Sequence, residues 1–199
     1  MRVTGVIQAG GKSTRMGGRP KALMDLGGRR IIERVMRALE SAVDDVLVVT
    51  NTPELYGFLG VPMVPDVYPD HGSLGGIYSG LKAASGDAAF TVACDMPFLR
   101  PEIVRMVVER AGAGDVVIPR VHGLYETLHA AYRKTCLPPM QERLNRGRLK
   151  IIDFFDAVQV VPIEEDELGR YGDPDIVFMN VNTPQELERA RALAERSAG

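Results

Sequence analysis

A stretch near the N-terminus, VTGVIQAGGKSTRMGGRPK (residues 3–21), indicates the fold class. Its first seven residues, 3–9, are mainly apolar and β-branched, as in a strand buried inside a sheet. A glycine-rich segment that carries four cations follows at once. Because α/β folds bind ligands at the carboxyl ends of parallel strands, the stretch predicts a loop that binds an anion. A surface loop with solvated charges is the alternative.

Further along the chain, short β-branched runs alternate with segments of helical periodicity. This alternation predicts one nucleotidyltransferase-type domain over residues 1–199, a Rossmann-like three-layer α/β sandwich whose mainly parallel sheet has helices on both faces. The acidic run at 164–167 is expected to be a solvated turn. The expected strands are 3–9, 45–50, 61–65, 88–94, 116–119, 128–132 and 158–163, and the expected helices are 31–41, 73–84, 139–146 and two that begin at Pro101 and Pro184.

Composition excludes several classes of function. The net charge is −2 and the pI about 6.0, so no basic field invites nucleic acid. The two cysteines, Cys94 and Cys136, form neither a disulfide framework nor a zinc motif. No segment approaches the roughly 20 apolar residues that span a bilayer, and the first apolar run is too short for a signal sequence. A cytoplasmic protein with no membrane or nucleic-acid partner is expected.

The N-terminal loop does not fit the two best-known phosphate loops. A Walker loop would need glycine at position 6, where Val6 stands, and the glycines come in adjacent pairs rather than in the dinucleotide pattern. The loop instead resembles the signature of pyrophosphorylase-type nucleotidyltransferases. Eight positions carry this resemblance: Ala9, Gly10, Gly11, Ser13, Arg15, Met16, Gly17 and Lys21.

A carboxylate follows the strand expected at 88–94. Asp95 lies where an α/β sheet presents ligands, and Mg²⁺ sites typically combine one or two protein oxygens with phosphate oxygens. Asp95 is therefore a candidate Mg²⁺ ligand. The alternative is that it caps the helix at Pro101, but it lies six residues too early for that role.

A pair of asparagines and a second glycine-rich turn complete the polar features. Asn180 and Asn182 would point to the same side of an extended segment and could complete a metal–phosphate site or bind a substrate phosphate. Asn182 could also help Thr183 to initiate the last helix, and both interpretations can hold. The turn at 71–76 is suited to the close approach of a ligand. The histidines form no recognisable catalytic pattern.

Taken in order, these segments resemble the molybdenum cofactor guanylyltransferase family over nearly the whole chain. The resemblance rests on the N-terminal loop and on CDMPFL (94–99), ETLHAAY (126–132) and NVNTP (180–184). Three residues depart from the family pattern: Gln8 replaces a leucine, and Ser73 and Thr127 each replace a proline.

The resemblance implies transfer of GMP from GTP to the terminal phosphate of the molybdenum cofactor, releasing pyrophosphate. The attacking phosphate is already ionised, so no general base is required, and catalysis reduces to positioning and charge neutralisation. Mg²⁺ would be the cofactor, and molybdoenzymes would receive the product. The implied nucleotide-binding residues are Gln8, Ala9, Gly10, Gly11, Lys21, Asn51, Asp66 and Asp95; the pterin-binding residues are Asn180 and Asn182; the catalytic residues are Arg15, Lys21 and Asp95; and the metal ligand is Asp95.

Alternatives remain at this point. A related enzyme could use CTP or make a nucleotide-sugar, and a non-catalytic adaptor could carry the pterin to molybdoenzymes. Lys21, Asp95 and the glycine-rich loop favour an enzyme, since a carrier would not need them. Asp66 could accept the N1–H and N2 amino donors of guanine, or it could simply form a turn before Pro69.

Overall fold

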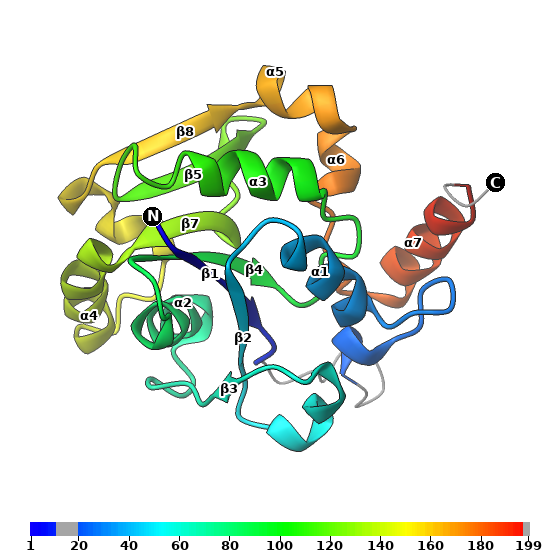
Figure 1. The fold of residues 1–199 in the computed structure, drawn as a ribbon, viewed down its shortest axis with the longest axis horizontal. Coiled ribbons are helices and arrows are strands. Elements are labelled where there is room, and N and C mark those ends of the chain that lie inside the picture. The colour runs from blue at the N-terminus through cyan, green and yellow to red at the C-terminus, as the bar shows by residue number, and fades with distance from the viewer. Residues whose placement is uncertain (11–19, 197–199) are drawn as a thin grey trace.

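A computed structural model describes residues 1–10 and 20–196 of the chain. Within them, helices cover both faces of one central sheet (Figure 1). The strands are β1 (Val3–Gln8), β2 (Asp45–Val49), β3 (Met63–Val64), β4 (Ala88–Ala93), β5 (Val116–Val121), β6 (Leu124–Tyr125), β7 (His129–Arg133) and β8 (Val160–Glu164). The α-helices are α1 (Ile31–Glu40), α2 (Gly72–Ala83), α3 (Pro101–Glu109), α4 (Leu137–Asn145), α5 (Glu165–Leu168), α6 (Pro174–Val177) and α7 (Pro184–Arg196).

The order of strands in the sheet is β3-β2-β1-β4-β7-β5-β6, with β8 paired to β5. The first four strands of this order are parallel, as expected, and β8 is parallel to β5. β7 runs antiparallel to both β4 and β5. The reason is local: β5 and β6 form a hairpin around His122 and Gly123, both with positive φ, and a hairpin reverses the chain without a helical crossover. The expected fold class is confirmed, and its parallel character holds for the β3–β4 half.

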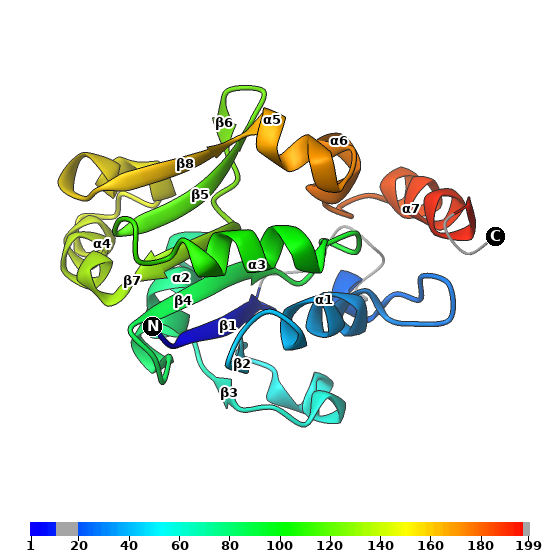
Figure 2. The same cartoon turned by 45° about the horizontal axis from the view of Figure 1, so that its top comes forward.

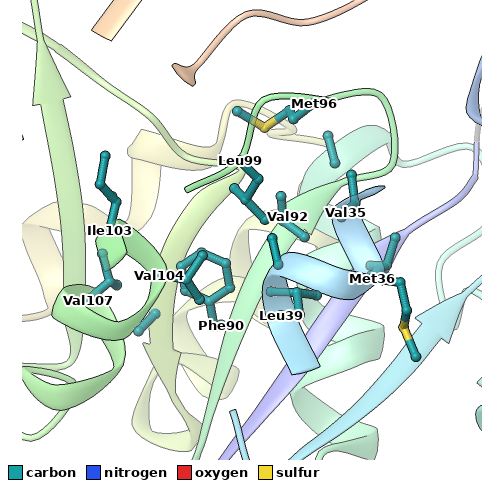
Figure 3. Close-up of a cluster of buried hydrophobic side chains, with 14 of the residues drawn as sticks. Val35, Met36, Leu39, Phe90, Val92, Met96, Leu99, Ile103, Val104 and Val107 are labelled. Atoms are coloured by element: carbon teal, nitrogen blue, oxygen red, sulfur yellow. The ribbon is translucent and has the colours of Figure 1, made fainter. Parts of the chain in front are cut away.

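The two faces of the sheet carry separate apolar clusters. On one face, α1 and α3 pack against β4 through side chains that include Leu39, Phe90 and Val104 (Figure 3). On the other face, α2 and α4 pack through a second set that includes Leu74 and Met140. β4 is buried along its whole length because it is central in the sheet and covered on both faces. This burial explains why its sequence is apolar without alternation.

Two glycines of helix α2 face β1 and leave no room for a side chain between helix and strand. A methyl group on Gly76 would lie 2.5 Å from Gln8 Oε1, and one on Gly80 would overlap the Val6 side chain. The glycines that follow residue 71 therefore allow α2 to pack directly against β1.

The last helix, α7, is held beside the loop that precedes α1 (Figure 2). A third apolar cluster joins them, in which Leu26 and Ile31 pack against Val181 and Leu187. Thr183 caps α7 as expected: its hydroxyl accepts from Glu186 N–H, and the Glu186 carboxylate accepts from Thr183 N–H. The segment before α7 is therefore held by the packing of Val181 and by the cap at Thr183.

One expectation about local structure is wrong. The acidic run at 164–167 forms the end of β8 and the short helix α5 rather than a turn. Two of its carboxylates make ion pairs, Glu164 with Arg120 on β5 and Glu167 with Arg110 after α3. These partners, distant in sequence, stabilise the regular structure. No helix among residues 1–10 and 20–196 combines the length and apolar character needed to cross a bilayer.

Candidate active site

Three segments that are far apart in the sequence meet at the carboxyl edge of β1 and β4. Lys21 Nζ donates a hydrogen bond of 2.6 Å to Asn182 Oδ1 and lies 3.9 Å from Asp95 Oδ2. The side chains of Lys21 and Asp95 are each 17% exposed, so this cluster is partly withdrawn from water but open to a ligand. The structure thus brings together one predicted residue from the N-terminal loop, one from the strand end and one from the asparagine pair.

Backbone hydrogen bonds position Asp95 between the other two segments. Cys94 N–H donates to Gln8 O at 3.1 Å and so continues the β1–β4 ladder to the end of β4. Val181 N–H donates to Asp95 O at 2.9 Å, which ties the segment before α7 to the strand end. The position of Asp95 therefore follows from the sheet itself, and Asn182 is placed by its attachment to that sheet.

The charges of the site are unevenly compensated. Burial raises the pKa of the Asp95 carboxyl, the Lys21 ammonium lowers it, and the nearby Glu186 raises it further, so that the pKa lies above its ordinary value. Glu186 itself is held ionised, with its pKa lowered mainly by the hydrogen bond from Asn182 N–H. A desolvated carboxylate near a second negative group would be stabilised by an added cation.

The oxygens present fit a hard divalent cation shared with a ligand. Asp95 offers a carboxylate and Asn182 an amide oxygen, the donor types that Mg²⁺ takes alongside phosphate oxygens and water. Among the residues that the structure describes, no three histidine, cysteine or acidic side chains gather as a metal-binding group. The chemistry of the cluster therefore fits a metal completed by phosphates rather than one enclosed by protein.

The other predicted nucleotide residues near β1 differ in their availability. The Ala9 N–H already donates to Val49 O at 2.9 Å, so it is not free for a ligand. Gly10 is exposed, with open space where a side chain would project. Gln8 Nε2 is buried and has no hydrogen-bond partner among the described residues. Gly11 and Arg15 lie outside the residues that the structure describes.

Asn51 and Asp66 form a second group, beyond the ends of β2 and β3. Asn51 Oδ1 accepts from Asp66 N–H at 3.0 Å. Asp66 Oδ1 accepts from Tyr68 N–H at 3.1 Å and from the Ser79 hydroxyl at 2.7 Å, so this oxygen does form a turn. Asp66 Oδ2 makes no hydrogen bond with the described residues, which leaves one oxygen of the carboxylate for another partner.

The two asparagines have different surroundings. Asn182 reaches Lys21, whereas Asn180 Nδ2 makes a 3.4 Å contact back to Phe178 O. The charge of Glu186 beside Asp95 was not predicted from the sequence, in which Glu186 stands three residues after Thr183 as in a helix cap. The cap spacing was visible in the sequence, but the proximity to Asp95 depends on the fold.

A separate pocket of about 810 Å³ lies between α1 and the start of α3. Its lining includes Arg29, Arg34 and Arg37 but none of the Lys21, Asp95 and Asn182 cluster. It contributes nothing to the geometry around Asp95.

Comparison with known proteins identifies the family of the chain. Residues 5–159 match the family described as the MobA-like NTP transferase domain. The chain belongs to this family. It is therefore a nucleotidyltransferase.

Two relatives align over almost the full length of the chain. The probable molybdenum cofactor guanylyltransferase of Pelotomaculum thermopropionicum is 39% identical, over 99% of this chain and 96% of its own. The molybdenum cofactor guanylyltransferase of Desulfosudis oleivorans is 40% identical, over 96% of this chain and 95% of its own. The alignments therefore extend past residue 159 and include the segment before α7.

Solved structures share the fold. The molybdopterin-guanine dinucleotide biosynthesis protein A of Archaeoglobus fulgidus superposes with a TM-score of 0.83 at 24% identity, covering 97% of this chain and 99% of its own. A CMP:2-keto-3-deoxy-manno-octonic acid synthetase complexed with CTP has a TM-score of 0.71 at 16% identity, covering 99% and 100%. At these identities the likeness concerns the fold alone.

Proposed function

We propose that the protein transfers GMP from GTP to the terminal phosphate of the molybdenum cofactor, forming the guanine dinucleotide of the cofactor and pyrophosphate. The observation that carries the proposal is the convergence of Lys21, Asp95 and Asn182 beside the N-terminal loop. The names of the relatives that match nearly the whole chain support the choice of substrates.

In the proposed reaction, an oxygen of the pterin's terminal phosphate attacks the α-phosphorus of GTP. The bond to the bridging oxygen breaks, and pyrophosphate leaves with that oxygen. The attacking phosphate is already ionised, so the chain needs to hold no proton. Lys21 neutralises charge on the triphosphate, and Asp95 would hold Mg²⁺ through its carboxylate. When bound, Mg²⁺ would neutralise the negative charge that develops on the leaving pyrophosphate.

The residues divide between the two substrates. Gly10, with Gln8 beside it, would approach the phosphates of GTP, and Asn51 and Asp66 would face its base. Asn180 and Asn182 would serve the acceptor. Because the cluster draws on both ends of the chain, we further propose that residues 1–199 act as one nucleotidyltransferase domain.

The test is turnover with defined substrates. The purified protein is incubated with molybdenum cofactor, Mg²⁺ and one of GTP, CTP, ATP or UTP, and both pyrophosphate and the dinucleotide product are measured. Release of pyrophosphate with GTP, loss of that release in EDTA and recovery with Mg²⁺ are the expected results. Turnover with CTP in preference to GTP would contradict the choice of base, and cofactor binding without turnover would indicate the adaptor.

A further inference from the structure

Glu126 has an unusual environment for a carboxylate. It lies in the turn between β6 and β7 and is half-buried, and burial alone raises the pKa of its carboxyl. Its side chain makes no ion pair or hydrogen bond with any described residue. By contrast, Asp95 has Lys21 nearby, and Asp115 accepts hydrogen bonds from Thr135 and Gln159. Glu126 therefore bears the cost of desolvation without a partner among the residues that the structure describes.

The backbone around Glu126 is held in place. Its N–H donates to Pro119 O at 3.0 Å, and its carbonyl accepts from His129 N–H at 2.9 Å. The next carbonyl, that of Thr127, accepts from the buried Tyr132 hydroxyl at 2.7 Å. The side chain is therefore presented from a fixed turn, which suits a group that orients a ligand.

The register of the sheet puts Glu126 at the same edge as Asp95. β7 begins at His129, which is paired with Val92 on β4. Because the two strands are antiparallel, the end of β4 lies beside the start of β7. Asp95, which follows β4, and Glu126, which precedes β7, are therefore at the same edge of the sheet. Asn51 follows β2, on the far side of β1, so Glu126 lies on the opposite side of Asp95 from the group proposed for the base. That side is left for the acceptor.

His129, three residues after Glu126, is packed between aromatic side chains. The His129 ring is fully buried, makes edge contacts with Phe90 and Phe178 at centroid distances of 5.2 and 4.8 Å, and has a pKa lowered to about 3 by burial. It is neutral at physiological pH and does not compensate the Glu126 charge.

We propose that Glu126 binds the pterin of the acceptor, accepting hydrogen bonds from its ring N3–H and its 2-amino group, an inference that rests on the proposed function. These two donors lie side by side, and the two oxygens of a carboxylate match them. Glu126 would thus determine specificity for a 2-amino-4-oxo ring, while Asn180 and Asn182 serve the phosphate end of the same substrate.

The first test compares Glu126→Gln with a matched control, Glu102→Gln, on the exposed first turn of α3. The amide keeps the shape of the side chain but replaces one acceptor with a donor. The KM for molybdenum cofactor should rise at least about tenfold in Glu126→Gln, whereas the KM for GTP and the melting temperature stay within error. The control should match wild type in all three. An unchanged KM for the cofactor in Glu126→Gln would overturn the assignment.

The second test needs no variant and no turnover. The wild-type protein is titrated with 6-hydroxymethylpterin and with 6-hydroxymethyllumazine, which carries an oxygen in place of the 2-amino group, and binding is followed by ring fluorescence. Wild type should bind the pterin at least about tenfold more tightly, and Glu126→Gln should lose this preference. Equal affinities in wild type would overturn the assignment. If wild type discriminates the rings but makes no dinucleotide, the proposed reaction fails and the Glu126 assignment stands.

Discussion

Lys21 and Asn182 lie 161 residues apart in the chain, yet a hydrogen bond of 2.6 Å joins Lys21 Nζ to Asn182 Oδ1. The partner is a neutral amide, so the bond fixes the ammonium without cancelling its charge. The carboxylate of Asp95 stands farther away, at 3.9 Å. The amide thereby positions the Lys21 ammonium at the edge of the sheet where we propose that the triphosphate binds.

Replacing Lys21 tests this arrangement. Lys21→Ala should lower kcat/KM for GTP by about a hundredfold, with both triphosphate affinity and rate reduced. Lys21→Arg should restore only part of the loss, because a planar guanidinium does not reproduce a compact charge between Asn182 and Asp95. Steady-state kinetics and calorimetric titration of GTP measure both effects. Lys150→Ala, which removes an exposed cation, should be neutral. If Lys21→Ala alters neither parameter, the N-terminal loop is a solvated surface feature.

Asp95→Asn should abolish Mg²⁺-dependent turnover while the protein stays folded. An amide binds Mg²⁺ more weakly than a carboxylate does. Without bound Mg²⁺, the negative charge on the leaving pyrophosphate is not neutralised. The melting temperature should not fall, because the substitution removes a desolvated carboxylate whose pKa is raised. Initial rates across a range of Mg²⁺ concentrations and a thermal melt are the measurements. Asp87→Asn, at an exposed position, is the control. Normal turnover in folded Asp95→Asn would refute the assignment of the metal.

Local sequence patterns predicted much of the fold because burial imposes a period on each element. The expected strand at 88–94 and the helix that begins at Pro101 correspond to β4 and α3. The direction of β7 was not predictable in the same way, since its run of buried residues reads alike in either orientation. The positive φ of His122, which turns the chain back, leaves no clear signal in a non-glycine residue.

The site was predictable residue by residue but not as an arrangement. Lys21, Asp95 and Asn182 were each identified from a motif, yet their contact depends on how α7 packs against the loop before α1. Asn182 and Asn180 were expected to point to the same side of an extended segment, but the sequence did not predict that Asn182 Oδ1 accepts from Lys21 Nζ. Glu126 belongs to a segment that the family resemblance identified, but its burial without a partner among the described residues depends on how the chain folds.

Helix α2 should be sensitive to a single methyl group at Gly80. Gly80→Ala would place that methyl within the Val6 side chain, and overpacking of this kind costs about 1–3 kcal/mol of unfolding free energy. Gly76→Ala should cost less, because the Gln8 side chain that it meets can move. Gly57→Ala is the control, since nothing lies within 4 Å of the added group. Urea denaturation measures all three. A Gly80→Ala protein as stable as wild type would show that α2 can move away from β1.

His129 should make stability depend on pH on the acid side. Its pKa is about 3 in the folded protein and near 6.5 when unfolded, so below pH 6.5 the unfolded chain binds the extra proton. Above pH 6.5 both states hold a neutral His129, so the free energy of unfolding is not reduced. Between pH 7 and pH 4.5 the free energy of unfolding should fall by about 2–3 kcal/mol. His129→Leu should lack this loss. The pKa of His122 is raised by Asp175 and Glu165, so His122 makes the protein more stable as the pH falls. Wild type and His129→Leu both contain His122, so its effect cancels when the two are compared. Parallel pH slopes of unfolding free energy would contradict the prediction.

Recognition of the base can be tested at Asp66, where the two carboxylate oxygens have different roles. Oδ1 accepts from Tyr68 N–H and from the Ser79 hydroxyl, so removing the whole side chain would also disturb the turn. Asp66→Asn is the sharper variant, because its amide oxygen can keep those two bonds.

In that variant the amide nitrogen takes the place of Oδ2 and presents donors to the donors of guanine N1 and N2. Wild type should prefer GTP over CTP, and Asp66→Asn should narrow the difference, since a site that leaves polar groups unpaired loses affinity. Calorimetric titration of both nucleotides into wild type, Asp66→Asn and Asp66→Ala measures the ratio. Ser79→Ala, which removes one partner of Oδ1 and leaves Oδ2 in place, should keep the preference. If Asp66→Asn has the wild-type ratio of GTP to CTP affinity, the Asp66 carboxylate only stabilises its turn, and other residues select the base.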